Sequence, residues 1–187
     1  MYPERPSWES LYMSMCYLMA YRSPDRSTKV GAVITTEDNV PIALGYNGLP
    51  RGMDDADEYH VKPEKYFYFE HAERNAIYNA ARIGARMDLA HTLYITWIPC
   101  ADCARAIKQT GVKRVVVHRQ GQEAYYHSKG SAGNWGDSQD ATQKILQGVE
   151  VEWFDGGIIG DLQGYYSSKF YRFPEGAFIP VENDDDS

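Results

Sequence analysis

Two short segments of this chain carry side chains that bind metal ions, and the fold must bring them together. The first is His71-Ala72-Glu73, and the second is Pro99-Cys100-Ala101-Asp102-Cys103. Zinc favours a tetrahedral shell of thiolate sulfur and imidazole nitrogen, and a catalytic zinc site takes three ligands from the protein and leaves the fourth position to water. We therefore predict that zinc is bound by His71, Cys100 and Cys103.

Glu73 is the residue that points to catalysis. In a regular helix a residue two positions on points roughly to the opposite side, so we expect His71 at the irregular start of a helix, where both side chains can reach one cavity. A carboxylate beside a metal-activated water molecule can accept its proton and pass it to a substrate. We predict that Glu73 performs this general acid and base chemistry.

The two cysteines are predicted to lie at the start of a second helix. Pro99 suits the first turn of a helix, where its missing N–H group costs nothing, and residues three positions apart then share one face. The helix dipole and the unpaired N–H groups at this end favour the thiolate form of a cysteine. Cys100 and Cys103 are therefore predicted to bind the metal as thiolates.

Two alternatives to a catalytic zinc site stay open. Structural zinc sites normally use four protein ligands; Cys16 lies in an apolar helical pattern that indicates a buried residue, so His60 is the remaining candidate for a fourth ligand. The second alternative is a catalytically silent nucleotide-binding regulator that keeps the metal for stability. Glu73 argues against it, because a silent site has no need of a proton carrier.

Residue patterns predict strands that alternate with helices. Apolar residues at helical spacing follow Ser7, which can cap a helix, while runs rich in β-branched and aromatic residues indicate strands. Predicted strands cover 30–36, 40–46, 92–97, 112–118 and 149–154, the first two as a hairpin, and predicted helices begin near Ser7, His71, Cys100 and Ser138. This order predicts an α/β fold in which helices cover a sheet.

The length of 187 residues favours one domain, a zinc-dependent unit over residues 1–187. Residues 53–69 are expected to form a loop over the active site or a contact with another subunit. Residues 119–137 form a polar, glycine-rich insertion, expected to be a flap over substrate or an inter-subunit arm. The extension from about 155 is rich in Gly and Tyr, and its pattern assigns no element.

Charge and hydropathy exclude some classes of function. The formal net charge of 19 − 26 = −7 argues against a broad nucleic-acid surface and is compatible with a local positive pocket for a small anion. No apolar run approaches the ~18 residues of a membrane span, so no membrane partner is expected. The first residues lack the apolar core of a signal peptide and the three cysteines form no disulfide framework, so we expect a cytoplasmic protein.

The pattern H-x-E…P-C-x-x-C is the signature of zinc deaminases that act on nucleobases. Together with 29–34 (KVGAVI) and 45–50 (GYNGLP), it makes residues 7–118 resemble the deoxycytidylate (dCMP) deaminase family. The resemblance implies a three-layer α/β/α cytidine deaminase-like fold with a five-stranded mixed sheet. It also implies conversion of dCMP to dUMP and ammonia, which supplies dUMP for dTMP synthesis. The family is usually a homohexamer, activated by dCTP and inhibited by dTTP with Mg²⁺.

The same resemblance assigns zinc binding and proton transfer to the residues already chosen on chemical grounds, and it adds substrate contacts. It implies that the backbone of Ala72 meets the base carbonyl and that Asn47 meets the sugar hydroxyl. Arg26 is the best candidate for the 5′-phosphate, with Lys29 and Arg51 behind it, because a guanidinium fork suits phosphate geometry. Alternative substrates are a 5-substituted dCMP or, as in tRNA adenosine deaminases of the same superfamily, a base in RNA.

Overall fold

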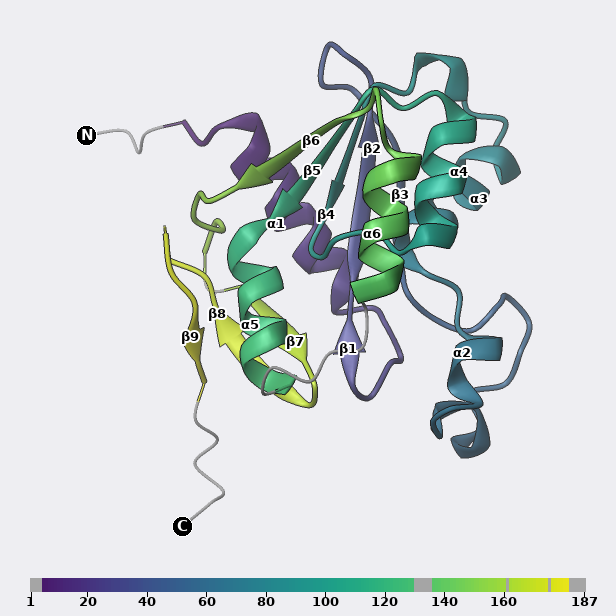
Figure 1. The fold of residues 1–187 in the computed structure, drawn as a ribbon, viewed down its shortest axis with the longest axis vertical. Coiled ribbons are helices and arrows are strands. Elements are labelled where there is room, and N and C mark those ends of the chain that lie inside the picture. The colour runs from purple at the N-terminus through teal and green to yellow at the C-terminus, as the bar shows by residue number, and fades with distance from the viewer. Residues whose placement is uncertain (1–4, 130–135, 161, 175, 182–187) are drawn as a thin grey trace.

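A computed structural model describes residues 5–129, 136–160, 162–174 and 176–181 of the protein (Figure 1). Its main sheet has five strands in the order β3-β2-β4-β5-β6. Strand β2 pairs antiparallel with β3 and β4, whereas β4–β5 and β5–β6 are parallel pairs. The predicted five-stranded mixed sheet is confirmed. Its strands are β2 (Gly31–Thr35), β3 (Pro41–Tyr46), β4 (Thr92–Ile95), β5 (Arg114–His118) and β6 (Glu150–Phe154).

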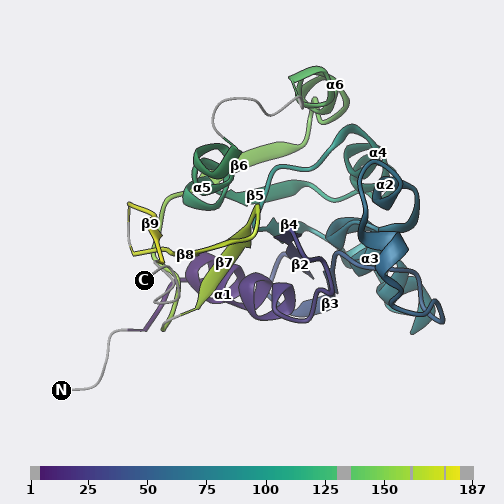
Figure 2. The same ribbon diagram turned by 90° about the horizontal axis from the view of Figure 1, so that it is seen from below.

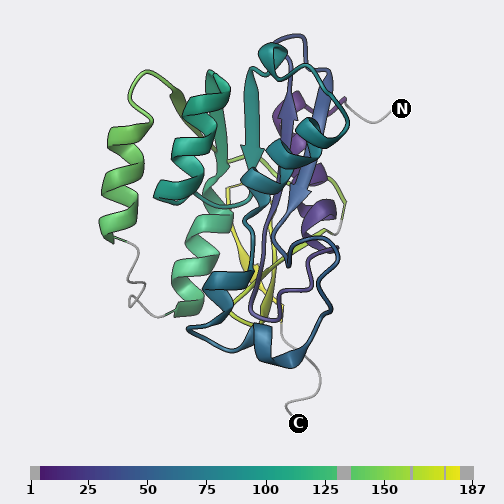
Figure 3. The same ribbon diagram turned by 90° about the vertical axis from the view of Figure 1, so that its right-hand side faces the viewer.

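Helices cover both faces of this sheet, as the α/β/α prediction requires (Figure 2). Helices α1 (Trp8–Ala20) and α5 (Arg119–Lys129) contribute to the core on one face. Helices α3 (Ala72–Arg82), α4 (Ala101–Thr110) and α6 (Gly136–Ile145) stand side by side on the other face (Figure 3). The chain also has two short 3-10 helices, η1 (Asp57–His60) and η2 (Met87–Leu89).

The strand sequences explain why both faces are covered. Val33, Tyr94 and Val116 belong to the core beneath α1, whereas their sequence neighbours belong to the core beneath α3 and α4. Successive side chains of a strand point to opposite faces, so an uninterrupted apolar strand needs a partner on each side. This central part of the sheet therefore fixes the three layers.

A second, four-stranded antiparallel sheet accounts for most of the C-terminal extension that the sequence left unassigned. Its order is β1-β7-β8-β9, with strands β1 (Thr28–Lys29), β7 (Gln163–Tyr166), β8 (Lys169–Arg172) and β9 (Ile179–Pro180). Thr28 lies opposite Tyr166 in the register. The C-terminal strands thus pair with the segment that leads into β2.

Two segments for which we expected a loop, a flap or a contact with another subunit contain helices. Residues 53–69 include η1 and a single helical turn, α2 (Lys65–Tyr68). The expected insertion at 119–137 contains α5 and the start of α6, while residues 130–135 lie outside the described chain. Among the described residues, no helix is both long and apolar enough to cross a lipid bilayer.

The start of α3 packs closely on β3 because Gly45 has no side chain. A Cβ atom placed on Gly45 would lie 2.3 Å from the backbone oxygen of Ala72 and 2.4 Å from the nitrogen of Ala76. Neither backbone atom can move without displacing the helix that follows His71. Gly45 therefore sets the distance between β3 and α3.

Replacing Gly45 by Ala is expected to lower the free energy of unfolding by about 1–3 kcal/mol or more, the usual cost of overpacking. Urea denaturation followed by circular dichroism measures this change. Gly48→Ala is the matched control, because its Cβ would meet side-chain atoms and no backbone, Pro24 at 3.1 Å and Tyr46 at 3.6 Å. Equal stability of the two variants would contradict this packing.

His118 is a buried histidine at the end of β5. Its Nδ1 atom lies 2.7 Å from the Tyr17 hydroxyl, and Phe154 and Phe173 pack against its ring. Burial lowers the pKa of His118 from 6.5 to about 3. The folded protein therefore holds this imidazole neutral at pH values at which the unfolded chain protonates it.

The protein is expected to lose stability as pH falls below 6.5, because the unfolded state then binds a proton that folded His118 does not accept. Between pH 7 and pH 5 this group should remove about 2 kcal/mol from the free energy of unfolding. Denaturation of the wild type and His118→Phe at both pH values isolates the effect. An equal loss in both proteins would show that His118 does not carry it.

Candidate active site

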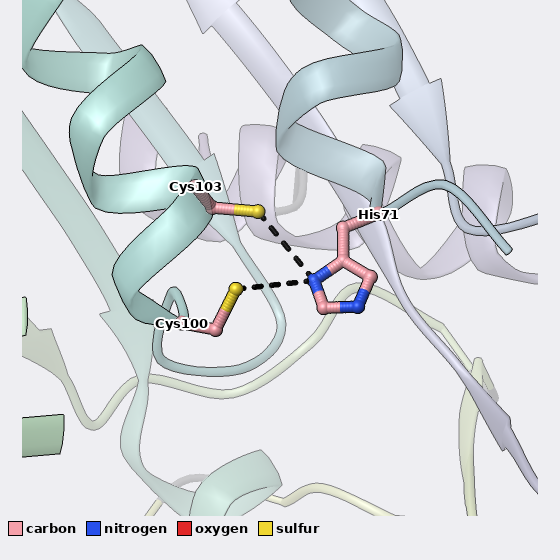
Figure 4. A group of neighbouring side chains, drawn as sticks. All are labelled: His71, Cys100 and Cys103. Atoms are coloured by element: carbon pink, nitrogen blue, oxygen red, sulfur yellow. Dashed lines mark hydrogen bonds between the residues drawn. The ribbon is translucent and has the colours of Figure 1, made fainter. Parts of the chain in front are cut away.

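Three predicted metal ligands meet where the helices α3 and α4 begin (Figure 4). His71 has an extended backbone (φ −84°, ψ 157°) and is the N-cap of α3, as predicted for the irregular start of a helix. Cys100 is the N-cap of α4, and Cys103 lies in its first turn. Pro99 therefore precedes the helix; our placement of Pro99 in the first turn was wrong because Cys100 is still extended.

The spacing of the three ligand atoms fits zinc. His71 Nδ1 lies 3.4 Å from Cys100 Sγ and 3.5 Å from Cys103 Sγ. With zinc–sulfur bonds near 2.3 Å and zinc–nitrogen bonds of 2.0–2.1 Å, the nitrogen–sulfur edge of a tetrahedron is about 3.5 Å. Both nitrogen–sulfur distances are thus already those that a tetrahedral zinc ion requires.

This group is the only set of three such ligands found within the described residues. His60, the candidate for a fourth ligand, instead places Nε2 2.6 Å from Asp55. The geometry therefore matches three protein ligands better than the four of a structural zinc site.

Electrostatics at the helix ends favour a thiolate. Hydrogen bonding with Cys103, opposed by burial and helped by His71, lowers the pKa of Cys100 to about 4. The hydrogen bond between the two cysteines, together with burial, raises the pKa of Cys103. Burial lowers the pKa of His71, but its hydrogen bond with Cys100 and the charge of Glu73 outweigh burial and raise it. One negative sulfur therefore forms readily beside the imidazole.

Glu73 is the second residue of α3, and its side chain is buried beside the metal-ligand group. It is only 3% exposed and lines the same pocket as His71 and Cys100. Burial raises the pKa of Glu73 above its ordinary value. A carboxylic acid whose pKa is raised toward neutrality is suited to exchange a proton with a substrate.

The pocket extends from the metal-ligand group along the loop before β1 and the α2 segment. Two predicted substrate contacts, Asn47 and Ala72, line it. Aromatic side chains enclose part of it, and the rings of Trp97 and Tyr125 lie 3.9 Å apart. Gln139 brings α6 to its rim, so the region after residue 119 takes part in the pocket.

The three predicted phosphate ligands lie outside the residues that line this pocket. Arg26 is exposed and forms an ion pair of 2.6 Å with Asp57. Lys29 donates to the backbone oxygen of Ser23, and Arg51 donates to the Asn79 side chain. Phosphate binding by these three cations stays a prediction.

Sequence reasoning missed three charged residues that line the pocket beside Glu73. Within the described chain these include Asp25, Lys62 and Lys65. The two lysines belong to a segment whose pattern indicated only a connection, and nothing in their spacing from His71 marked them. The only available signal was that the same segment was expected to lie over the active site.

The fold and this site define a class of protein. A mixed five-stranded sheet between helical layers holds a group of one imidazole and two thiols, and His and Cys side chains are the metal ligands of zinc deaminases that act on nucleobases. A model of the "Cytidine and deoxycytidylate deaminase zinc-binding region" matches residues 6–119. The chain belongs to this cytidine and deoxycytidylate deaminase family, and the resemblance inferred from the sequence is confirmed.

Individual relatives agree with the family model. An uncharacterized deaminase from the luxG 3′ region of Aliivibrio fischeri is 33% identical over 148 residues, which cover 78% of this chain and 92% of that protein. The deoxycytidylate deaminases of Mus musculus and Homo sapiens are each 36% identical over 115 residues, which cover 58% of this chain. The match spans 63% of the length of each mammalian enzyme.

A solved structure extends the similarity beyond the family model. The crystal structure of dCMP deaminase from the cyanophage S-TIM5, in complex with dCMP and dUMP, matches this fold with a TM-score of 0.60 and 28% sequence identity. The match covers 81% of this chain and 100% of the phage chain.

Proposed function

We propose that the protein is a zinc-dependent dCMP deaminase, which converts dCMP and water to dUMP and ammonia. The observation that carries the proposal is the group of His71, Cys100 and Cys103 beside the buried acid Glu73 in one pocket. Membership of the deaminase family supports it, as does similarity to a phage dCMP deaminase that was crystallised with dCMP and dUMP.

In this mechanism the zinc ligands are His71, Cys100 and Cys103. A zinc ion bound there supplies a water molecule acidic enough to act as a nucleophile at neutral pH. Glu73 accepts the proton of the attacking water and delivers it to N3 of the cytosine ring. As the bond between C4 and the amine breaks, Glu73 takes the remaining proton from the hydroxyl now on C4 and passes it to the leaving amine, so that the hydroxyl becomes the carbonyl of dUMP and ammonia departs.

The first backbone groups of α3 contribute to binding of the base. The N–H group of Ala72 opens the helix, where backbone donors have no partner within the helix. The helix dipole also places partial positive charge at this end. We assign this N–H to the carbonyl oxygen of the base, and Asn47 to the sugar hydroxyl. Regulation by dCTP and dTTP with Mg²⁺ and assembly into a homohexamer stay predictions from the family resemblance.

Zinc analysis of the purified protein should give about one ion per chain. Cys103→Ser should lose most of this zinc, because a neutral hydroxyl is a poor substitute for a thiolate. Cys16→Ser is the matched control, since Cys16 is fully buried but its sulfur hydrogen-bonds to the backbone oxygen of Tyr94 instead. Retention of zinc by Cys103→Ser would contradict the assigned ligand set.

Glu73→Gln should lower kcat for dCMP by about 10²–10⁴-fold, the usual contribution of a general acid and base. Zinc content and thermal stability should stay near those of the wild type, because the amide keeps the shape of the side chain. Ammonia release measures the effect, with 5-methyl-dCMP, CMP, deoxycytidine and dCTP as comparison substrates. Normal turnover by Glu73→Gln would remove the assigned role, and preference for 5-methyl-dCMP would change the assigned substrate.

A further inference from the structure

A buried ion pair lies beside the pocket and takes no part in the mechanism above. Lys65 of α2 places Nζ 2.5 Å from Asp25 Oδ2 and 2.6 Å from Oδ1. The two side chains are only 7% and 4% exposed. Burial of two charges is costly unless their geometry and remaining hydrogen bonds are well satisfied. The role of the pair therefore depends on the neighbouring groups to which it is hydrogen-bonded.

The Asp25 carboxylate organises the loop that leads into β1. Its Oδ1 accepts hydrogen bonds from the backbone N–H groups of Ser27 and Thr28, at 2.8 and 3.1 Å. Its Oδ2 accepts a hydrogen bond of 3.0 Å from Nδ2 of Asn47. Asp25 thus joins α2, the loop before β1 and the end of β3 at one point.

The Asn47 amide is held in one orientation by this arrangement. Nδ2 donates to Asp25 and, at 2.9 Å, to the backbone oxygen of Thr28. Oδ1 accepts a hydrogen bond of 2.7 Å from the N–H group of Val30. Rotating the amide by 180° would place its oxygen against two acceptors and its nitrogen against a donor. Both amide hydrogens are therefore committed to the protein, and Oδ1 keeps one lone pair for a ligand.

The C-terminal sheet supports the same arrangement. Thr28, which accepts the second hydrogen bond from Asn47, lies in β1 and pairs with Tyr166 of β7. Ser168 also donates its backbone N–H to the oxygen of Ser27, at 2.9 Å. Strands beyond the residues that match the family model thus brace the loop that orients Asn47.

We propose that Asp25 and Lys65 are positioning residues that orient Asn47 so that it presents only a hydrogen-bond acceptor to the pocket. An acceptor at this position selects a ligand with a hydroxyl donor. The inference rests on the proposed function, in which the ligand is dCMP, whose single free sugar hydroxyl is at the 3′ position. Asp25 and Lys65 then determine the preference for a 3′-hydroxyl without contacting it themselves.

The test uses the double variant Asp25→Asn/Lys65→Met in the full-length protein, with dCMP and 2′,3′-dideoxy-CMP as substrates. The variant removes both charges together, so no unpaired charge is left buried. The amide introduced at position 25 keeps its oxygen toward the N–H groups of Ser27 and Thr28, so its nitrogen faces Nδ2 of Asn47. Two donors then oppose each other, and the Asn47 amide is expected to rotate. Arg114→Met is the matched control: Arg114 is a half-buried cation paired with Glu9 and Glu152 and lies outside the pocket-lining residues.

The wild type should have a KM for dideoxy-CMP roughly tenfold above that for dCMP, the value of one hydrogen bond. In the double variant KM for dCMP should rise about tenfold, while kcat and the KM for dideoxy-CMP change little. Discrimination between the two substrates would then disappear. Arg114→Met should lose thermal stability but keep the wild-type discrimination.

Two results would overturn the inference. If the double variant keeps the wild-type discrimination, Asp25 and Lys65 do not orient Asn47 toward a hydroxyl. If kcat and KM change together in proportion to lost stability, as for a purely structural pair, the positioning role is also excluded. A wild-type protein that releases no ammonia from dCMP would overturn the proposed function itself and this inference with it, which distinguishes the two failures.

Discussion

The meeting of one imidazole nitrogen and two sulfur atoms at the beginnings of α3 and α4 is the constraint on which the rest of the structure depends. Each helix starts with an extended residue, His71 or Cys100, so that a ligand atom projects beyond the helix toward the other one. The two nitrogen–sulfur distances are already those of a tetrahedral zinc shell. This spacing is preserved because α3 packs closely on β3 at Gly45 and α4 packs on the same face of the sheet.

Much of the fold follows from local sequence, and the exceptions have physical reasons. The five strands of the main sheet were predictable because each is a run of apolar, β-branched or aromatic residues that needs cover on its buried faces. Strands β7, β8 and β9 were not, because they are short and lie in a segment rich in Gly and Tyr. The edge strand of their sheet, β1 (Thr28–Lys29), pairs with β7 and lies far away in the sequence. Helix α5 was missed because its glycine and polar residues resemble a loop.

The candidate site also has a part that could be predicted from the sequence and a part that could not. The metal-ligand group was predictable because residue type and spacing express its chemistry within two short segments. The surroundings of a long cationic side chain are set by tertiary structure and cannot be read from nearby residues. The sequence therefore favoured Arg26 as the phosphate ligand, whereas in the structure its guanidinium pairs with Asp57 outside the pocket. Lys65 gave no signal, because its partner Asp25 is 40 residues away in the sequence. Residues that position a ligand are thus harder to find than residues that bind a metal.

X-ray absorption at the zinc edge tests the central claim most directly, because it reports the atoms around the ion without reference to activity. The account predicts two sulfur atoms at about 2.3 Å and lighter nitrogen or oxygen neighbours at about 2.0–2.1 Å, one of them an imidazole. Replacement of Cys100 by Ser should reduce the sulfur count to one in any zinc that remains. A shell of four protein ligands, or sulfur absent from the shell, would contradict the catalytic metal site on which this account is built.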